Sequence, residues 1–255
     1  MEGKPLTENC KRVYDSKEHV CFGISPFNSY FSERRLRDLA HWGRSHFQSM
    51  HFFVPDVPAA YTLEALGYTP ERAAWKARRQ ANWLRNKIIR SLISLSFTHH
   101  ESEKMVLDWE KLVSISRFQE IYREIQGLFR KDSAFRGACI EASHWILEKR
   151  VADTLALTDE ALLRAVEYFL AEIPLFLDAA SILNQKASVF AYHQSIPFLE
   201  NLYRNQFFCQ VPSERQGYVI LAAKKENEIR DANSLHLQPP ISESGNYEVS
   251  LPSED

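Results

Sequence analysis

Ser25 is the first residue whose type and surroundings can support chemistry. It follows an apolar run, residues 19–24, that has the length and composition of a buried strand. Ligands of open α/β sheets bind beyond the ends of such strands, where a serine can act as a nucleophile. Gly23 has no Cβ and can admit a substrate close to the backbone. A turn serine of purely structural role is the alternative; an α/β-hydrolase elbow is excluded, because Phe27 stands where its second glycine belongs.

Tyr168 and Glu172 form a second candidate pair. They are four residues apart in an apolar stretch with helical periodicity, so their side chains share one helical face. A carboxylate on a buried helix must find a cationic partner or take up a proton. Glu172 is therefore either a docking point for a substrate ammonium group or half of a structural salt bridge.

Together the two elements resemble the signatures of tRNA-dependent cyclodipeptide synthases. Residues 19–25 (His-Val-Cys-Phe-Gly-Ile-Ser) resemble the first signature, and residues 27–31 (Phe-Asn-Ser-Tyr-Phe) continue the likeness. The second signature, Tyr-x-x-x-Glu-x-Pro, and a further active-site tyrosine of the family are matched by Tyr168, Glu172, Pro174 and Tyr192. Order and separation also match, so the resemblance covers residues 18–222.

The resemblance departs from the family pattern at a few positions. Cys21 and Phe22 replace the usual aliphatic pair, and Phe169 replaces an aliphatic residue; such changes reshape a pocket without touching the chemistry. With Asn28, the chain resembles the branch of the family that has asparagine at this position. The role of His193 stays open.

The resemblance implies a fold like the catalytic domain of class I aminoacyl-tRNA synthetases and a reaction that consumes two aminoacyl-tRNAs. Ser25 would attack the first ester and carry aminoacyl and then dipeptidyl intermediates until a diketopiperazine closes. Glu172 would anchor the ammonium group and accept a proton, Tyr168 would orient the substrate, and Tyr192 would relay a proton or position a group. The expected substrate-binding residues are Gly23, Asn28, His193, Cys21, Phe53, Leu175 and Phe190, the last four as walls of the first aminoacyl pocket.

No cofactor or metal is expected. The sequence has neither the His-Ile-Gly-His nor the Lys-Met-Ser-Lys-Ser element of synthetases, and neither G-x-G-x-x-G nor a P-loop. His46 with His51, and His99 with His100, show no third ligand and are interpreted as surface or packing histidines.

A strongly basic helix is predicted from Thr69 to about residue 96. Thr69-Pro70-Glu71 has a capping hydroxyl, a proline at the first helical position and an acid in the first turn. Seven basic residues against Glu71 alone give this helix a formal +6, in a chain of net charge −2. A solvated face is the alternative, but the concentration favours phosphate binding, and the resemblance implies tRNA as the ligand. The expected tRNA-binding residues are Arg72, Lys76, Arg78, Arg79, Arg85, Lys87 and Arg90.

The elements that must position these groups indicate an α/β protein with a Rossmann-like, mostly parallel five-stranded sheet flanked by helices. Strands are predicted at 19–24, 51–54, 105–109, 189–192 and 218–222, and helices at 33–47, 69–96, 114–130, 134–150 and 158–183. Pro174 should kink the last helix. We expect a flexible arm at 1–17, a single catalytic domain at 18–223 and a flexible acidic tail at 224–255.

The bulk composition is that of an ordinary globular chain, with 255 residues of which 45% are hydrophobic and 25% charged. Cysteines 10, 21, 139 and 209 lack metal or disulfide spacing, and Cys21 reads as a buried thiol. No apolar run reaches the ~18 residues of a membrane span and no signal core is present, so we expect a cytoplasmic monomer. Two other functional classes stay open: a non-catalytic RNA-binding module, and a serine hydrolase with His19 or His193 as base.

Overall fold

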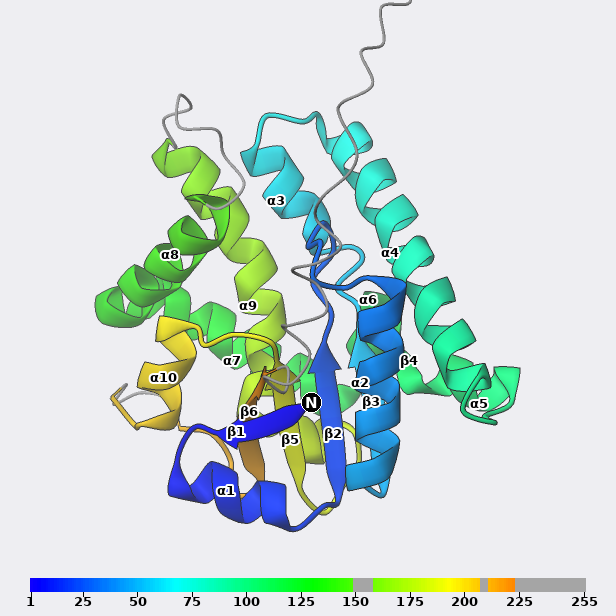
Figure 1. The fold of residues 1–255 in the computed structure, drawn as a ribbon. Coiled ribbons are helices and arrows are strands. Elements are labelled where there is room, and N and C mark those ends of the chain that lie inside the picture. The colour runs from blue at the N-terminus through cyan, green and yellow to red at the C-terminus, as the bar shows by residue number, and fades with distance from the viewer. Residues whose placement is uncertain (149–157, 207–210, 223–255) are drawn as a thin grey trace, which may run out of the picture. The chain divides into compact units, whose positions relative to one another are not determined.

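The computed structural model describes residues 1–148, 158–206 and 211–222, and its centre is a six-stranded sheet (Figure 1). The strands are β1 (Glu2–Pro5), β2 (His19–Gly23), β3 (Ser49–Phe53), β4 (Val106–Leu107), β5 (Ser188–Tyr192) and β6 (Gln216–Ala222). Their order is β1-β6-β5-β2-β3-β4; β1 is antiparallel to β6, and all other neighbours are parallel. The expected mostly parallel α/β sheet is confirmed, with a sixth strand added at one edge.

Helices connect most of these strands. They are α1 (Glu8–Asp15), α2 (Glu33–His46), α3 (Ala59–Ala65), α4 (Pro70–Ile93), α5 (His99–Met105), α6 (Trp109–Val113), α7 (Ser116–Lys131), α8 (Ser133–Glu148), α9 (Asp159–Ile182) and α10 (Pro197–Tyr203). The long helices α4 and α9 begin at the predicted caps, because the hydroxyls of Thr69 and Thr158 accept hydrogen bonds from backbone N–H groups of the first turn.

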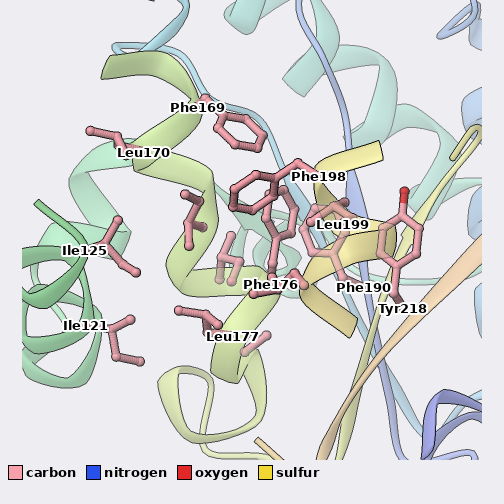
Figure 2. Close-up of a cluster of buried hydrophobic side chains, with 14 of the residues drawn as sticks. Ile121, Ile125, Phe169, Leu170, Phe176, Leu177, Phe190, Phe198, Leu199 and Tyr218 are labelled. Atoms are coloured by element: carbon pink, nitrogen blue, oxygen red, sulfur yellow. The ribbon is translucent and has the colours of Figure 1, made fainter. Parts of the chain in front are cut away.

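Alternate residues of the strands point to opposite faces of the sheet and build two cores. On one face, Cys21, Phe53 and Phe190 pack with α7, α8, α9 and α10. On the other face, Phe22 and Phe52 pack with α2 and α4. Figure 2 shows the first core, in which aromatic rings of α9, α10 and β5 meet edge to face. This packing holds α9 firmly against the sheet and so places the side chains that α9 presents beside it.

Residues 1–17 do not form the expected flexible arm. β1 pairs with β6 from Glu2↔Ala222 onward, and α1 begins at the capping hydroxyl of Thr7. Cys10 is fully buried, and its Sγ accepts a hydrogen bond of 3.2 Å from the Tyr218 N–H. The segment looks polar in sequence because an edge strand pairs through its backbone alone, and because α1 buries only two side chains.

The break in α9 lies one turn later than predicted. Pro174 stays within the helix, and the backbone leaves helical geometry at Asp178 (φ −158°, ψ 53°). The Asp178 carboxylate accepts a hydrogen bond from the Ser181 N–H and caps a new final turn, while the Leu177 carbonyl accepts one from the Ser213 N–H. The regular hydrogen bonding of the helix therefore ends where a side chain and a neighbouring segment provide hydrogen-bond partners for the backbone.

The described residues belong to one compact unit, residues 1–222, whereas the predicted acidic tail (224–255) and Cys209 lie outside the described residues. Cys10, Cys21 and Cys139 are buried. Within the described ranges, no helix is long and apolar enough to cross a membrane, and no cluster of three or more potential ligands is placed to hold a metal.

His19, which is buried, and His51, which is half-buried, form a polar pair between β2 and β3. The His19 Nδ1 lies 2.8 Å from the Ser188 Oγ, and its Nε2 lies 2.9 Å from the His51 Nδ1. Burial lowers the pKa of His19 to about 3 and that of His51 to about 4; His51 adds to the effect on His19, and Lys111 to that on His51. The facing nitrogens share one proton, so protonation of both rings would set two N–H donors against each other.

The free energy of unfolding is expected to fall as the pH is lowered from 7 towards 4. In this range the unfolded chain, with ordinary histidine pKa values near 6.5, binds more protons than the folded chain. The free energy of unfolding keeps its full value above pH ~6.5 and decreases as the pH falls from there towards the folded pKa values. By pH ~5 the loss is roughly 2 kcal/mol for each histidine. Urea unfolding between about pH 4.5 and 8 measures this slope.

His51→Gln should flatten the pH dependence, whereas His99→Gln, at an exposed histidine, should leave it as in the wild type. Equal slopes in the wild type and His51→Gln would show that this histidine pair does not control acid stability.

Candidate active site

Two parallel strands end side by side at the centre of the sheet. β2 pairs with β5 from Val20↔Val189 to Phe22↔Ala191. From β2 the chain winds through β3 and β4 towards one edge, and from β5 through β6 towards the other. The boundary between β2 and β5 is therefore the point where the winding reverses, which is where open α/β sheets form a ligand crevice beyond the carboxyl ends of their strands.

Ser25 and Tyr192 meet at this boundary. Ile24 extends the β2–β3 ladder by donating its N–H to the Phe53 carbonyl at 2.9 Å, and Ser25 is the next residue. Tyr192 is the last residue of β5. The Ser25 Oγ lies 3.0 Å from the Tyr192 hydroxyl oxygen, so the phenol is within reach to exchange a proton with the serine.

The loop after Ser25 is held by Asn28. Its Oδ1 accepts a hydrogen bond from the Tyr30 N–H at 3.0 Å, which turns its Nδ2 towards the His193 Nε2 at 3.1 Å. The amide donates, so this ring nitrogen of His193 accepts, and the proton of the neutral ring is on Nδ1. His193 also stacks on Tyr30, with ring centroids 4.0 Å apart. Phe27 makes the turn possible by adopting a left-handed φ of 62°, a conformation that costs a non-glycine residue about 1 kcal/mol or more.

Neither histidine considered for a hydrolase contacts Ser25 within the described residues. His19 begins β2, roughly 20 Å away along the strand, and is bonded to Ser188 and His51. The His193 Nε2 is bonded to Asn28. The geometry therefore does not support a serine hydrolase of the Ser–His type.

Ser25 opens into a cavity of about 290 Å³. Its lining includes the predicted residues Gly23, Ser25, Asn28, Tyr168, Glu172, Phe190, Tyr192 and His193. All four expected catalytic residues therefore surround one space, although they come from β2, α9 and β5.

Helix α9 contributes a stripe of residues spaced four apart, namely Tyr168, Glu172 and Phe176. Tyr168 is buried in a small apolar cluster that Ala59, Ala60 and Leu63 of α3 share with Ala73 and Ala77 of α4, and α3 packs against both α9 and α4. Among the described residues that line the cavity, Glu172 is the one carboxylate, and there is no lysine or arginine. The cavity is thus suited to an uncharged side chain accompanied by a cationic group.

Three of the expected pocket residues are not placed at the cavity. Cys21, Phe53 and Leu175 are fully buried in the core beneath it. Leu175 points away because one residue rotates a helical side chain by about 100° from Phe176. Burial also raises the pKa of the Cys21 thiol, which keeps it neutral. Of the four proposed walls, only Phe190 reaches the space next to Ser25.

Several lining residues were not predicted: Phe27, Ser29, Trp145, Ile146, Phe176, Gln194, Ile196, Leu199 and Tyr218. Trp145 lines the cavity from α8. Phe176 could have been found, because it continues the four-residue spacing of α9. Phe27 and Ser29 lie in the loop directly after Ser25, and Gln194 and Ile196 lie in the loop after β5. The remaining residues come from α8, α10 and β6, and no local pattern connects those segments to Ser25. Figure 2 shows Phe176, Phe190, Leu199 and Tyr218 gathered on the side of the core that borders the cavity.

Gly23 makes room for aromatic rings rather than for a substrate. A Cβ built at this position would lie 2.7 Å from the Phe190 Cζ and 3.4 Å from the Tyr192 Cδ2. The absence of a side chain therefore lets Phe190 and Tyr192 close against β2, which sets the position of the Tyr192 hydroxyl.

The basic residues of α4 fall into two groups. Arg72, Arg78 and Arg79 are exposed and Lys76 is half-buried. The other three are engaged: Arg85 with Glu103 at 2.9 Å, Arg90 with Glu33 at 3.3 Å, and Lys87, which is buried with its Nζ 3.1 Å from the ring centroid of Trp83. The amino-terminal half of α4 therefore presents the available positive charge, and this half belongs to the same apolar cluster as Tyr168.

Comparison with known proteins gives a consistent result. A sequence model described as cyclodipeptide synthase matches residues 1–223. The cyclo(L-leucyl-L-leucyl) synthase of Staphylococcus haemolyticus is 32% identical over 232 residues, which cover 88% of this chain and 96% of that protein. The cyclo(L-tyrosyl-L-tyrosyl) synthase of Mycobacterium tuberculosis is 31% identical over 218 residues, covering 86% of this chain and 74% of that protein.

Solved structures agree with this assignment. A cyclodipeptide synthase from Bacillus thermoamylovorans has a TM-score of 0.80 and 31% identity, with 87% of this chain and 95% of that chain covered. A Mycobacterium tuberculosis structure, described as relating cyclodipeptide synthetases to type I tRNA synthetases, has a TM-score of 0.75 and 30% identity, with 86% and 91% covered. The expected likeness to class I synthetase catalytic domains is confirmed.

Gly23→Ala is expected to destabilise the protein by about 1–3 kcal/mol, because the new methyl group would collide with Phe190. Urea unfolding measures the loss. Gly127→Ala is a matched control, since a Cβ at this helical position meets nothing within 4 Å. The control should be stabilised by about 0.5–1 kcal/mol. Unchanged stability in Gly23→Ala would mean that the Phe190 ring has another place to go.

Proposed function

Because the chain belongs to the cyclodipeptide synthase family, we propose that it joins two aminoacyl groups, delivered on tRNA, into a diketopiperazine through ester intermediates on Ser25. The observation that carries the proposal is the hydrogen bond of 3.0 Å between the Ser25 Oγ and the Tyr192 hydroxyl, in a cavity that Tyr168 and Glu172 also line. A nucleophile, a proton carrier and a carboxylate thus share one space.

In the first step the Ser25 Oγ attacks the ester carbonyl of the first aminoacyl-tRNA. The new Ser25 ester forms as the bond to the ribose oxygen breaks, and Tyr192 passes the serine proton to the departing oxygen. Glu172 holds the ammonium group of the substrate, and Tyr168 orients it. Exchange of one ester for another is close to neutral in free energy, so this step needs no ATP.

In the second step the amine of the Ser25-bound residue attacks the ester carbonyl of the second aminoacyl-tRNA; an amide bond forms as the bond to the second ribose oxygen breaks. An α-amino group has a pKa near 8, and in this proposal Glu172, which lines the same cavity, takes its proton. The amine of the resulting dipeptide then attacks the Ser25 ester, closes the ring and releases the serine. Both steps turn an ester into an amide and are downhill, so the main task is orientation, which is worth roughly 7–11 kcal/mol in favourable cases.

The walls of the cavity favour apolar aminoacyl groups. Phe176, Phe190, Ile196 and Leu199 line it, with Trp145 on the side of α8. Related proteins form cyclo(L-leucyl-L-leucyl), cyclo(L-tyrosyl-L-tyrosyl) and cyclo(L-leucyl-L-phenylalanyl) products. We therefore propose that at least one of the two residues joined here is a large apolar or aromatic amino acid.

The available cations of α4 support tRNA as the carrier of these groups. Phosphate contacts position a nucleic acid, and selection of the amino acid is left to the cavity. The same fold is bound to Phe-tRNAPhe in the cyclodipeptide synthase of Candidatus Glomeribacter gigasporarum, which is 14% identical to this chain at a TM-score of 0.51.

Mass spectrometry of medium from bacteria that express the chain is expected to detect new cyclic dipeptides, and Ser25→Ala should reduce them below detection. The alanine variant lacks the oxygen that carries both intermediates. Ser29→Ala, in the same loop and on the same cavity, is the control that should retain product. With purified enzyme and one aminoacyl-tRNA, the intact mass should increase by one aminoacyl residue in the wild type and in Ser29→Ala, but not in Ser25→Ala.

Product from the Ser25→Ala variant would remove Ser25 as the carrier. A folded wild type that yields no product with purified aminoacyl-tRNAs would instead favour a non-catalytic RNA-binding role.

The double variant Arg78→Ala/Arg79→Ala is expected to weaken tRNA binding. It should also reduce the slope of log affinity against log salt concentration by about one to two units, because fewer counterions are released on binding when a phosphate contact is missing. Fluorescence anisotropy at several salt concentrations measures both. Arg90→Ala is the matched control, since this guanidinium already pairs with Glu33 and should matter less. Equal affinities of the wild type and the double variant would mark this face of α4 as merely solvated.

A further inference from the structure

Two tryptophans lie on the surface of the basic helix. Trp75 is 58% exposed and Trp83 is 49% exposed, although aromatic side chains of this size are usually mostly buried. Neither belongs to a core cluster of the described chain. Their exposure needs a reason, because a folded protein gains nothing from leaving two indoles in water.

The indoles alternate with cations at a spacing of four residues. Along α4 the order is Trp75, Arg79, Trp83 and Lys87. Because residues four apart lie on the same helical face, these side chains form one row along the helix. The Arg79 Cζ lies 5.2 Å from the ring centroid of Trp75, and the Lys87 Nζ lies 3.1 Å from that of Trp83. Each cation holds one side of an indole and leaves much of the ring exposed to solvent.

The same arrangement occurs once more at the start of the helix. Arg72 and Lys76 both approach the ring of Tyr68, at 5.4 Å and 5.0 Å from its centroid. The row of rings and cations thus extends over much of α4, which is about 36 Å long at 1.5 Å per residue. The first half of α4 shares an apolar cluster, built on α3, with Tyr168, which lines the cavity of Ser25.

The chemistry of this row selects its ligand. A helix with a formal +6 attracts a polyanion. A flat, exposed aromatic ring beside a cation suits a nucleobase, as in single-stranded nucleic-acid binding sites. Paired bases in a duplex hide their faces in the stack, so only unpaired nucleotides can use the indoles. A tRNA carries such nucleotides next to its aminoacyl end, the end that must reach Ser25.

We propose that Trp75 and Trp83 stack on unpaired nucleotides at the acceptor end of the tRNA, with Arg79 and Lys87 fixing the indoles. The proposal rests on the proposed function. It also accounts for Lys87, a cation too buried to meet a phosphate, as the support of Trp83. The exposed arginines Arg72, Arg78 and Arg79 contact phosphates of the same segment.

The test compares two RNA hairpins that share an acceptor-stem duplex, one with a four-nucleotide 3′ overhang and one blunt. The wild type should bind the overhang hairpin more tightly. Trp75→Ala and Trp83→Ala should each weaken that binding by about 5- to 150-fold and leave the affinity for the blunt hairpin unchanged. Phenylalanine at either position should restore much of the difference. Ile93→Ala, at an exposed apolar residue of the same helix, should bind both hairpins as the wild type does.

The proposal is overturned if the alanine variants lose affinity for both hairpins equally, or for neither. Circular dichroism of the variants excludes a folding defect as the cause of any loss. An assay of cyclic dipeptide synthesis tests the proposed function independently of the stacking. A wild type that makes product but whose tryptophan variants bind normally refutes the stacking alone, whereas a wild type that binds neither hairpin and makes no product refutes both.

Discussion

The structure depends on the parallel pairing of β2 with β5. This pairing joins segments far apart in the chain, and it is the point from which the winding proceeds in opposite directions. Because both strands end at the same edge, their next side chains project into one crevice, and the Ser25 Oγ and the Tyr192 hydroxyl come within 3.0 Å. Gly23 contributes by having no side chain, since a methyl group there would displace the rings that close the pair. A one-residue slip of either strand would turn these groups to the other face.

Helix α9 connects the core to the chemistry. One side of it is packed into the aromatic core with α7, α8 and α10, and another side carries Tyr168, Glu172 and Phe176 into the cavity. The dense packing fixes the rotation of the helix, so a carboxylate that would be costly in a closed core is presented at a cavity instead. Tyr168 in turn shares an apolar cluster with Ala73 and Ala77 of α4 through α3, which ties the basic helix to the same site. Packing is thus expected to be coupled through α9 to the proposed catalysis and the proposed tRNA binding.

Negative and positive charge are placed on different parts of the protein. The cavity holds a single carboxylate among its described lining residues, whereas the cations of α4 lie outside it, on a surface with exposed indoles. A polyanionic carrier and a small cationic head group can therefore be held by different parts of the protein. The pairing of Arg85 and Arg90 with acids, and the cover of Trp83 over Lys87, confine the free positive charge to the half of α4 that adjoins the site.

By itself the sequence determined what depends on neighbours along the chain. The apolar run before Ser25, the caps at Thr69 and Thr158, and the four-residue spacing of Tyr168 and Glu172 are local patterns, and all appear in the structure as expected. The tertiary structure decided what depends on segments distant in sequence. β1 joins the edge of the sheet through backbone pairing, which does not depend on a side-chain pattern. Cys21, Phe53 and Leu175, expected as pocket walls, lie in the core. The tertiary structure also brought Trp145, Leu199 and Tyr218 to the cavity, because only the packing of α8, α10 and β6 around β5 determines which side chains reach the space beside Ser25.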